Sequence, residues 1–126
     1  MRTNAVISVV DDDEAFRAGL VDLFRSAGLQ VRDFGSAEEL MQSPVLPAMA
    51  CLIIDLRMPG KSGLALRSEL AGRGLEPPTI LMTAYATPQV RQEAAMLGIS
   101  VIEKPADPEL VLAEVDRCLR LSGPHA

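Results

Sequence analysis

The stretch "CLIIDLRMPG", residues 51–60, decides the fold. Four apolar residues run without interruption into Asp55, and Pro59 and Gly60 then turn the chain away. Continuous apolar runs of this length are typical of strands that are covered by helices on both faces of a sheet. The stretch therefore predicts a buried strand of a parallel sheet, ending on a carboxylate.

Outward from this strand, apolar runs alternate with segments of helical periodicity. Turn residues separate them: Gly28 ends one helical segment, the capping box "SAEE" (36–39) opens a short helix that Pro44 and Pro47 end, and "TP" (87–88) opens another. Five strand–helix repeats predict an α/β sandwich with a parallel sheet. The predicted strands are 5–10, 29–34, 51–55, 79–83 and 100–103. The predicted helices are 14–27, the short helix that opens at 36–39, and then 63–72, 87–97 and 107–120.

Within these helices, apolar spacing predicts which side chains face the core. The predicted inward residues are Phe16, Leu20, Leu23, Phe24 and Ala27, then Leu66 and Leu70, then Val90, Ala94 and Leu97, and finally Val111, Val115, Cys118 and Leu119.

Composition narrows the class of protein. The chain has 126 residues and a net charge of −5, without a basic stripe, which favours one domain and argues against direct nucleic-acid binding. It has neither a signal peptide nor an apolar run of membrane length. Cys51 and Cys118 lack metal-site spacing and are predicted to be buried thiols in a reducing compartment, which favours the cytoplasm. His125 lies in a polar terminus.

Chemically active side chains follow four of the five predicted strands. Asp11, Asp12 and Asp13 follow the first strand, Asp55 ends the third, Thr83 ends the fourth and Lys104 follows the fifth. The second strand, ending at Asp33-Phe34, is the exception. Functional groups of open α/β sheets gather at the carboxyl ends of the strands. If the first and third strands are neighbours, their carboxylates share one pocket.

Such a pocket needs a cation, or its carboxylates must take up protons. Two carboxylates about 4 Å apart repel by about 4 kcal/mol at an effective dielectric near 20, a large share of the ~5–15 kcal/mol that holds a domain folded. A hard divalent ion such as Mg²⁺ suits oxygen ligands, and Lys104 adds a fixed positive charge. The alternative is a solvated helix start at "DDDE", with one aspartate as the N-cap.

The segments "VVDDDEAFR", "LIIDLRMPGKSGL", "ILMTAYA" and "GISVIEKP" together carry a family resemblance. The chain resembles the receiver domain of two-component response regulators over residues 4–120. The sequences of its motifs are most similar to those of regulators of the nitrogen-fixation type. The resemblance implies a flavodoxin-like (βα)5 fold with strand order 2-1-3-4-5. It makes residues 1–126 a single receiver domain, with 121–126 as a tail or the start of a linker.

The resemblance also implies a Mg²⁺ site. Asp12 and Asp55 are the expected direct ligands, together with the backbone carbonyl of Arg57, and Asp11 is expected to act through a water molecule.

Phosphoryl chemistry is implied at the same place. Asp55 is the expected phosphoacceptor, Lys104 is expected to pair with a phosphoryl oxygen, and the Thr83 hydroxyl is expected to donate to another. The bond before Pro105 is typically cis in this family.

Two departures from the family pattern bear on signalling. Val101 stands where receivers commonly carry Phe or Tyr, and Ala106 where Phe is frequent. Two hypotheses for signalling compete: a muted movement of Val101, or a movement of the segment after Thr83 in which Tyr85 rearranges. A third is that phosphorylation is coupled more weakly to output. Arg57 and Tyr85 are expected to flank the pocket mouth and to tune the lifetime of the acyl phosphate.

The function implied by the resemblance is a Mg²⁺-dependent switch that is phosphorylated by a sensor histidine kinase or a phosphotransfer protein. Such a domain catalyses its own phosphorylation and slow dephosphorylation without turning over an outside substrate. Its expected output surface comprises residues 87–97, 100–103 and 107–120, through which an output domain, a partner protein or a second copy would bind, and no membrane is involved.

Three rival functions are distinguishable in the sequence. An aspartyl phosphatase would need a second Asp where Arg57 stands, and a flavin or dinucleotide binder would need a phosphate-holding loop where "DDDE" repels phosphate. A phosphorylation-independent pseudo-receiver would have lost one of the key residues; none is lost, and only Val101 keeps this alternative open.

Overall fold

The structure is a computed structural model that describes residues 5–122, with side chains to Leu121. Strands and helices alternate along this part of the chain. The elements in chain order are β1 (Val6–Val10), α1 (Glu14–Ser26), β2 (Val31–Phe34), α2 (Ala37–Met41), a 3₁₀ turn (Leu46–Ala48), β3 (Met49–Asp55), α3 (Gly63–Gly72), β4 (Thr79–Thr83), α4 (Pro88–Met96), β5 (Ser100–Glu103) and α5 (Pro108–Ser122).

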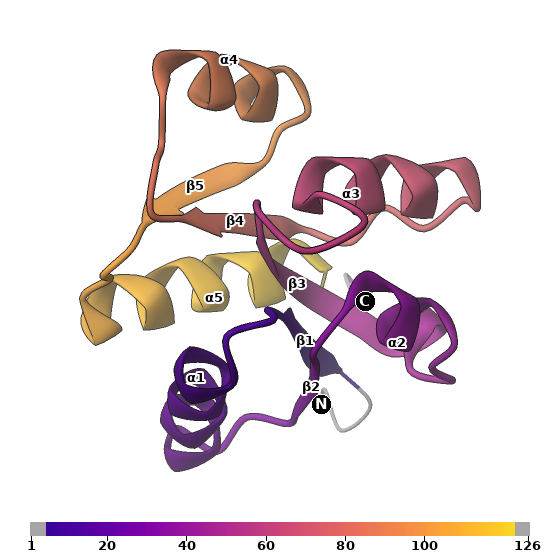
Figure 1. Cartoon of the computed structure of the whole chain (residues 1–126). Coiled ribbons are helices and arrows are strands. Elements are labelled where there is room, and N and C mark those ends of the chain that lie inside the picture. The colour runs from indigo at the N-terminus through magenta and orange to yellow at the C-terminus, as the bar shows by residue number, and fades with distance from the viewer. Residues whose placement is uncertain (1–4, 123–126) are drawn as a thin grey trace.

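The five strands form one parallel sheet in the order β2-β1-β3-β4-β5 (Figure 1), which confirms the predicted flavodoxin-like topology. The central strand β3 is buried from Ala50 to Asp55, because helices cover both of its faces. Each parallel connection passes through a helix, so all five strands present their carboxyl ends at the same edge of the sheet.

Helices cover the two faces unequally. On one face, α1 and α5 pack on the sheet through apolar side chains that include Phe24, Val115 and Leu119. On the other face, α2 and α3 pack through Leu40, Leu66 and their neighbours, while α4 contributes a smaller cluster around Ala94. The loops after β3, β4 and β5 and the start of α1 lie at the carboxyl edge of the sheet (Figure 1).

The helix starts follow the predicted capping chemistry. Side chains of Asp13, Ser36, Ser62 and Thr87 each accept a hydrogen bond from a backbone N–H in the first helical turn. The predicted capping box is present in modified form, because the Glu39 carboxylate accepts from the N–H of Gly35 instead of that of Ser36.

Some predicted boundaries and burial assignments differ from the structure. Strand β3 begins two residues before the predicted position, at Met49. In α1, Val21 is buried and Ala27 exposed, since Ala27 is the C-cap and lies beyond the last inward-facing turn. Leu97 is 49% exposed for the same reason at the end of α4.

At the C-terminus, α5 extends through Ser122, into the residues predicted as a tail. His125 and residues 123–126 lie outside the described residues.

The two cysteines are buried, as predicted. Cys51 on β3 and Cys118 on α5 are 0% and 2% exposed and belong to one apolar cluster. A hydrogen bond with Cys118, together with burial, raises the pKa of the Cys51 thiol well above its ordinary value. The pair is therefore part of the core.

Among residues 5–122, none of the helices combines the length and the apolar character that a bilayer crossing requires.

Candidate functional site

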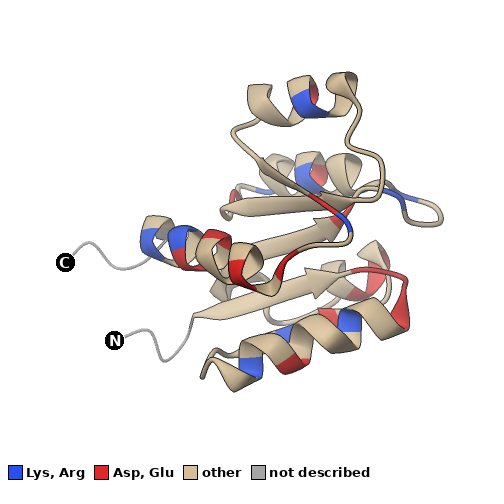
Figure 2. Cartoon of the chain, turned by 90° about the vertical axis from the view of Figure 1, so that its left-hand side faces the viewer, with Lys and Arg blue, Asp and Glu red and all other residues tan. Residues whose placement is uncertain are grey.

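Three carboxylates converge at the carboxyl edge of the sheet. Val10 pairs with Ile54 in register, so the residues that follow, Asp11 and Asp55, end neighbouring strands side by side. Asp12 joins them, and the three side chains each offer an oxygen within 4.8 Å of the others. Figure 2 shows this concentration of acidic segments where β1 passes into α1 and where β3 ends. The sequence prediction that these carboxylates share one pocket is consistent with this placement.

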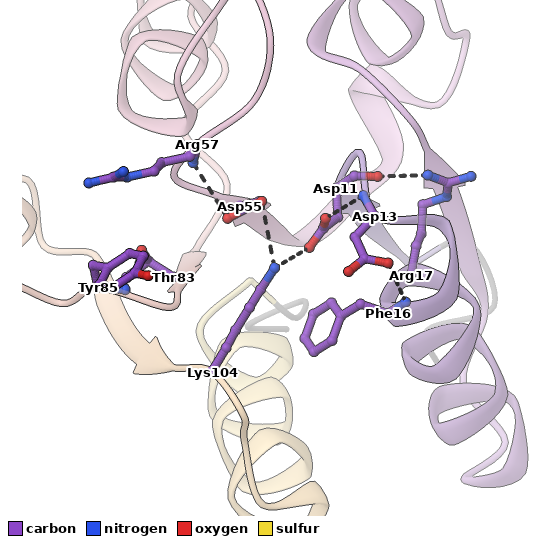
Figure 3. A network of polar contacts seen from close by, with 9 residues as sticks. All are labelled: Asp11, Asp13, Phe16, Arg17, Asp55, Arg57, Thr83, Tyr85 and Lys104. Carbon is purple, nitrogen blue, oxygen red and sulfur yellow. Dashed lines mark hydrogen bonds and ion pairs between the residues drawn. The ribbon is translucent and has the colours of Figure 1, made fainter.

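Lys104 reaches into the carboxylate cluster from the loop after β5. Its Nζ lies 2.9 Å from Asp11 Oδ2 and 3.6 Å from Asp55 Oδ2 (Figure 3), and its side chain is only 17% exposed. The Lys104 backbone N–H donates to the carbonyl of Thr83 at 2.8 Å, and the following bond to Pro105 is cis, the geometry that the resemblance implies. One ammonium group thus faces two of the three carboxylates.

The acidic run "DDDE" divides its roles. Asp13 is the N-cap of α1, where its Oδ1 accepts from the N–H of Phe16 at 3.1 Å. Asp11 turns back into the cluster, where its Oδ1 accepts from the Asp13 N–H at 2.9 Å. Arg17 fixes the strand end by donating to the Asp11 carbonyl at 2.7 Å and to Asp33 Oδ2 at 2.8 Å. The predictions of a helix cap and of a carboxylate pocket therefore apply to different members of one run.

The electrostatics favour binding a cation here. Burial, together with the negative charge of Asp11, raises the pKa of Asp55, and Lys104 and the Arg57 N–H offset only part of that effect. Burial alone would lower the pKa of Lys104, but its hydrogen bond to Asp11 and the charges of Asp11 and Asp55 outweigh burial and raise it. Lys104 therefore stays positively charged, and the cluster retains a negative excess.

The other predicted site residues surround this cluster at different distances. Thr83, 1% exposed, ends β4, and its hydroxyl accepts from the Tyr85 N–H at 3.1 Å. The Arg57 N–H donates to Asp55 Oδ1 at 3.4 Å, and the Arg57 guanidinium lies 5.2 Å from the centre of the Tyr85 ring (Figure 3). Val101 lies apart, half-buried against the α4 cluster.

Tyr85 is 62% exposed, so most of its side chain faces solvent. Its ring and the Arg57 guanidinium lie together on the side of Asp55 away from Asp11 (Figure 3).

Sequence reasoning missed two residues that shape the site. The helical spacing predicts only a core-facing role for Phe16, yet its ring centre lies 4.2 Å from the Lys104 Nζ. The sequence pattern predicts only a helix start at Gly63, yet a Cβ at that position would lie 2.5 Å from the Asp55 carbonyl oxygen. Neither contact has a local sequence signal, because each joins residues far apart in the chain.

Comparison with known proteins places these observations in a family. Residues 7–116 match the response regulator receiver domain family. Nodulation protein W of Bradyrhizobium diazoefficiens is 40% identical over 115 residues, which are 90% of this chain and 51% of that protein. The transcriptional regulatory protein FixJ of Azorhizobium caulinodans is 38% identical over 118 residues, covering 93% of this chain and 56% of that protein.

Solved structures agree with the sequence matches. The response regulator StyR superposes with a TM-score of 0.84 at 32% identity, over 94% of this chain and 60% of that one. The structure of FixJ-N superposes with a TM-score of 0.81 at 29% identity, over 92% and 94%. The chain spans about half the length of these two curated relatives. Fold, site and comparisons agree, and the chain belongs to the response regulator receiver domain family.

Proposed function

We propose that this receiver domain accepts a phosphoryl group on Asp55 and acts as a conformational signalling switch. The observation that carries the proposal is the meeting of Asp11, Asp12 and Asp55 within 4.8 Å, with Lys104 beside them. Acidic clusters are common on protein surfaces, but Asp11 is 2% and Asp55 9% exposed, and such burial of charge is costly without a functional return.

Mg²⁺ fits the donor set of this cluster. Three carboxylates and one ammonium leave two negative charges uncompensated, and carboxylate oxygens are the ligands that this cation prefers. We assign Asp12, Asp55 and the Arg57 carbonyl as direct ligands, with Asp11 acting through a water molecule. When bound, the ion would offset the negative charge of the phosphoryl oxygens.

The transfer itself uses the side chain at the end of β3. A carboxylate oxygen of Asp55 attacks the phosphorus of a phosphohistidine, the P–N bond breaks with its electron pair leaving on the imidazole, and an acyl phosphate forms. Lys104, held beside the same carboxylate, pairs with a phosphoryl oxygen. Positioning and charge compensation supply most of what such a transfer requires.

Thr83 would report the modification. Its hydroxyl accepts from the Tyr85 N–H and keeps its own proton free to donate, so a phosphoryl oxygen on Asp55 would compete for it. Movement of Thr83 would pull on the segment that carries Tyr85. Because Tyr85 is exposed and Val101 is packed against the α4 cluster, we favour output through residues 84–90. Phosphorylation would then shift the population of two existing conformations.

The partners follow from the proposed chemistry. A sensor histidine kinase or a phosphotransfer protein would donate the phosphoryl group in the cytoplasm. Residues 1–126 would form one receiver domain, and the surface of α4, β5 and α5 would contact an output domain, a partner protein or a second copy. The two curated relatives named above, a nodulation protein and a transcriptional regulatory protein, are about twice as long as this chain, which supports an output domain in the whole protein.

The test is incubation with acetyl phosphate or phosphoramidate, with and without Mg²⁺. The expected result is a Mg²⁺-dependent, hydroxylamine-labile mass gain that maps to Asp55 and that Asp55→Asn abolishes. Labelling of Asp55→Asn at a wild-type rate would refute the assignment of the acceptor. An unlabelled wild-type protein that still binds its partners would favour the pseudo-receiver alternative.

A further inference from the structure

The ring of Phe16 lies against the ammonium group of Lys104. Its centre is 4.2 Å from Nζ, and Figure 3 shows the ring on the side of the ammonium that turns away from Asp55. Asp11 and Asp55 take the other directions, at 2.9 and 3.6 Å. The lysine head group is therefore held between two carboxylates and an aromatic ring.

Phe16 is fixed in place independently of the lysine. Its backbone N–H donates to the N-cap Asp13, so it belongs to the first turn of α1, and its side chain packs against the core cluster beneath α1 and α5. Lys104, by contrast, is a charge on a flexible four-carbon stem that several rotamers could direct elsewhere. The rigid member of the contact is the ring.

We infer that Phe16 is a positioning residue, whose ring holds the Lys104 ammonium where it meets a phosphoryl group on Asp55. The inference rests on the proposed function. A cation attracted to a ring face is stabilised most when water is excluded, and the Lys104 side chain is 17% exposed. When a phosphoryl group binds at Asp55, the ion pairs of Lys104 with Asp11 and Asp55 are expected to change. The ring then keeps the ammonium group in its position beside Asp55.

The experiment compares Phe16→Leu with the wild-type protein in two measurements. At saturating Mg²⁺, labelling by phosphoramidate is expected to slow by roughly threefold to thirtyfold, the range that corresponds to losing one cation–π contact. Mg²⁺ affinity by calorimetry is expected to stay within about twofold, because the ring touches no carboxylate. Phe16→Tyr, which keeps the ring, is expected to restore the rate.

Leu23→Ala is the matched control. Leu23 lies on α1 two helical turns from Phe16 and lines the same apolar hollow toward α5. Its truncation is expected to lower stability without changing the labelling rate.

Three results would overturn the inference: a wild-type rate in Phe16→Leu, a parallel loss of rate and Mg²⁺ affinity, or a Phe16→Tyr protein as slow as Phe16→Leu. An unlabelled wild-type protein would remove the proposed function and the inference with it, whereas a labelled wild type beside an unaffected Phe16→Leu removes only the inference.

Discussion

At the amino-terminal edge of the sheet, helices return to strands through turns built on Gly28, Gly74 and Gly98, with φ of 79°, 79° and 70°. At the carboxyl edge, the strand ends and the loops that follow carry Asp11, Asp55 and Lys104. At the first edge, glycine adopts these positive φ angles without steric strain. The second gathers like charges whose mutual repulsion opposes folding. The residues of the first edge favour folding, whereas the charges gathered at the second edge oppose it.

Helix α3 allows the two edges to be compared with one substitution, because it has a glycine at each end. At Gly63, a Cβ would lie 2.5 Å from the Asp55 carbonyl oxygen and 3.0 Å from Ile54 Cγ2. Gly63→Ala is therefore expected to lower the free energy of unfolding by about 3 kcal/mol, the upper range for overpacking, and to displace Asp55. Urea unfolding and phosphoramidate labelling measure the two effects.

Gly72→Ala is the control at the other end of α3. A Cβ there would meet nothing within 4 Å, and the residue is helical, so alanine is expected to stabilise by about 0.5–1 kcal/mol. Equal effects at Gly63 and Gly72 would contradict the claim that the carboxyl edge is the tightly constrained one.

Replacing the Lys104 ammonium group at the carboxyl edge is expected to have the next largest effect on the free energy of unfolding. Lys104→Met leaves Asp11, 2% exposed, without its ion-pair partner, and is expected to cost about 2 kcal/mol at pH 7. The pKa of Lys104 is raised in the folded chain, so its stabilisation is complete below the unfolded-state pKa near 10.4 and fades as the pH rises above it. The deficit of the variant should therefore shrink in alkali.

Lys61→Met provides the matched control, because Lys61 pairs with Glu69 but is 38% exposed. Exposed ion pairs contribute only about 0–1 kcal/mol, so thermal unfolding should change little. A cost at Lys61 equal to that at Lys104 would mean that the site lysine is an ordinary surface charge.

The same contrast explains what could be predicted from the sequence. The strands, the helix caps and the convergence of Asp11 and Asp55 follow from local patterns and from the rule that parallel strands end at one edge. The contacts of Phe16 with Lys104 and of Gly63 with Asp55 depend on how separate elements pack. The helical spacing of Phe16 is explained by a core-facing position in α1, and the sequence gives no separate indication of its contact with Lys104.

Replacing the Asp55 carboxylate at the carboxyl edge should raise the free energy of unfolding, the opposite of the effect expected at Lys104. Burial and the charge of Asp11 raise the pKa of Asp55, so ionised Asp55 costs the folded state stability above its folded pKa, and this cost vanishes as the pH falls below the unfolded value near 3.9. Asp55→Asn is expected to stabilise by about 1 kcal/mol at pH 7 and by less in acid.

Asp22→Asn, at an exposed position of α1, should leave unfolding unchanged. A destabilised Asp55→Asn protein at pH 7 would contradict the picture of a site that opposes folding, because it would mean that the carboxylate is well accommodated by Lys104 alone.

Between the two edges, Ser8 tests whether polar groups outside the site are also costly. It lies in the middle of β1 at 0% exposure, and among the described residues its hydroxyl has no hydrogen-bond partner. Burying an unpaired hydroxyl costs about 1 kcal/mol or more, so Ser8→Ala is expected to raise the free energy of unfolding by about 0.5–1 kcal/mol. Labelling of Asp55 should be unchanged. A loss of stability in urea unfolding would show instead that the hydroxyl is satisfied, and that the costly polar groups are confined to the carboxyl edge.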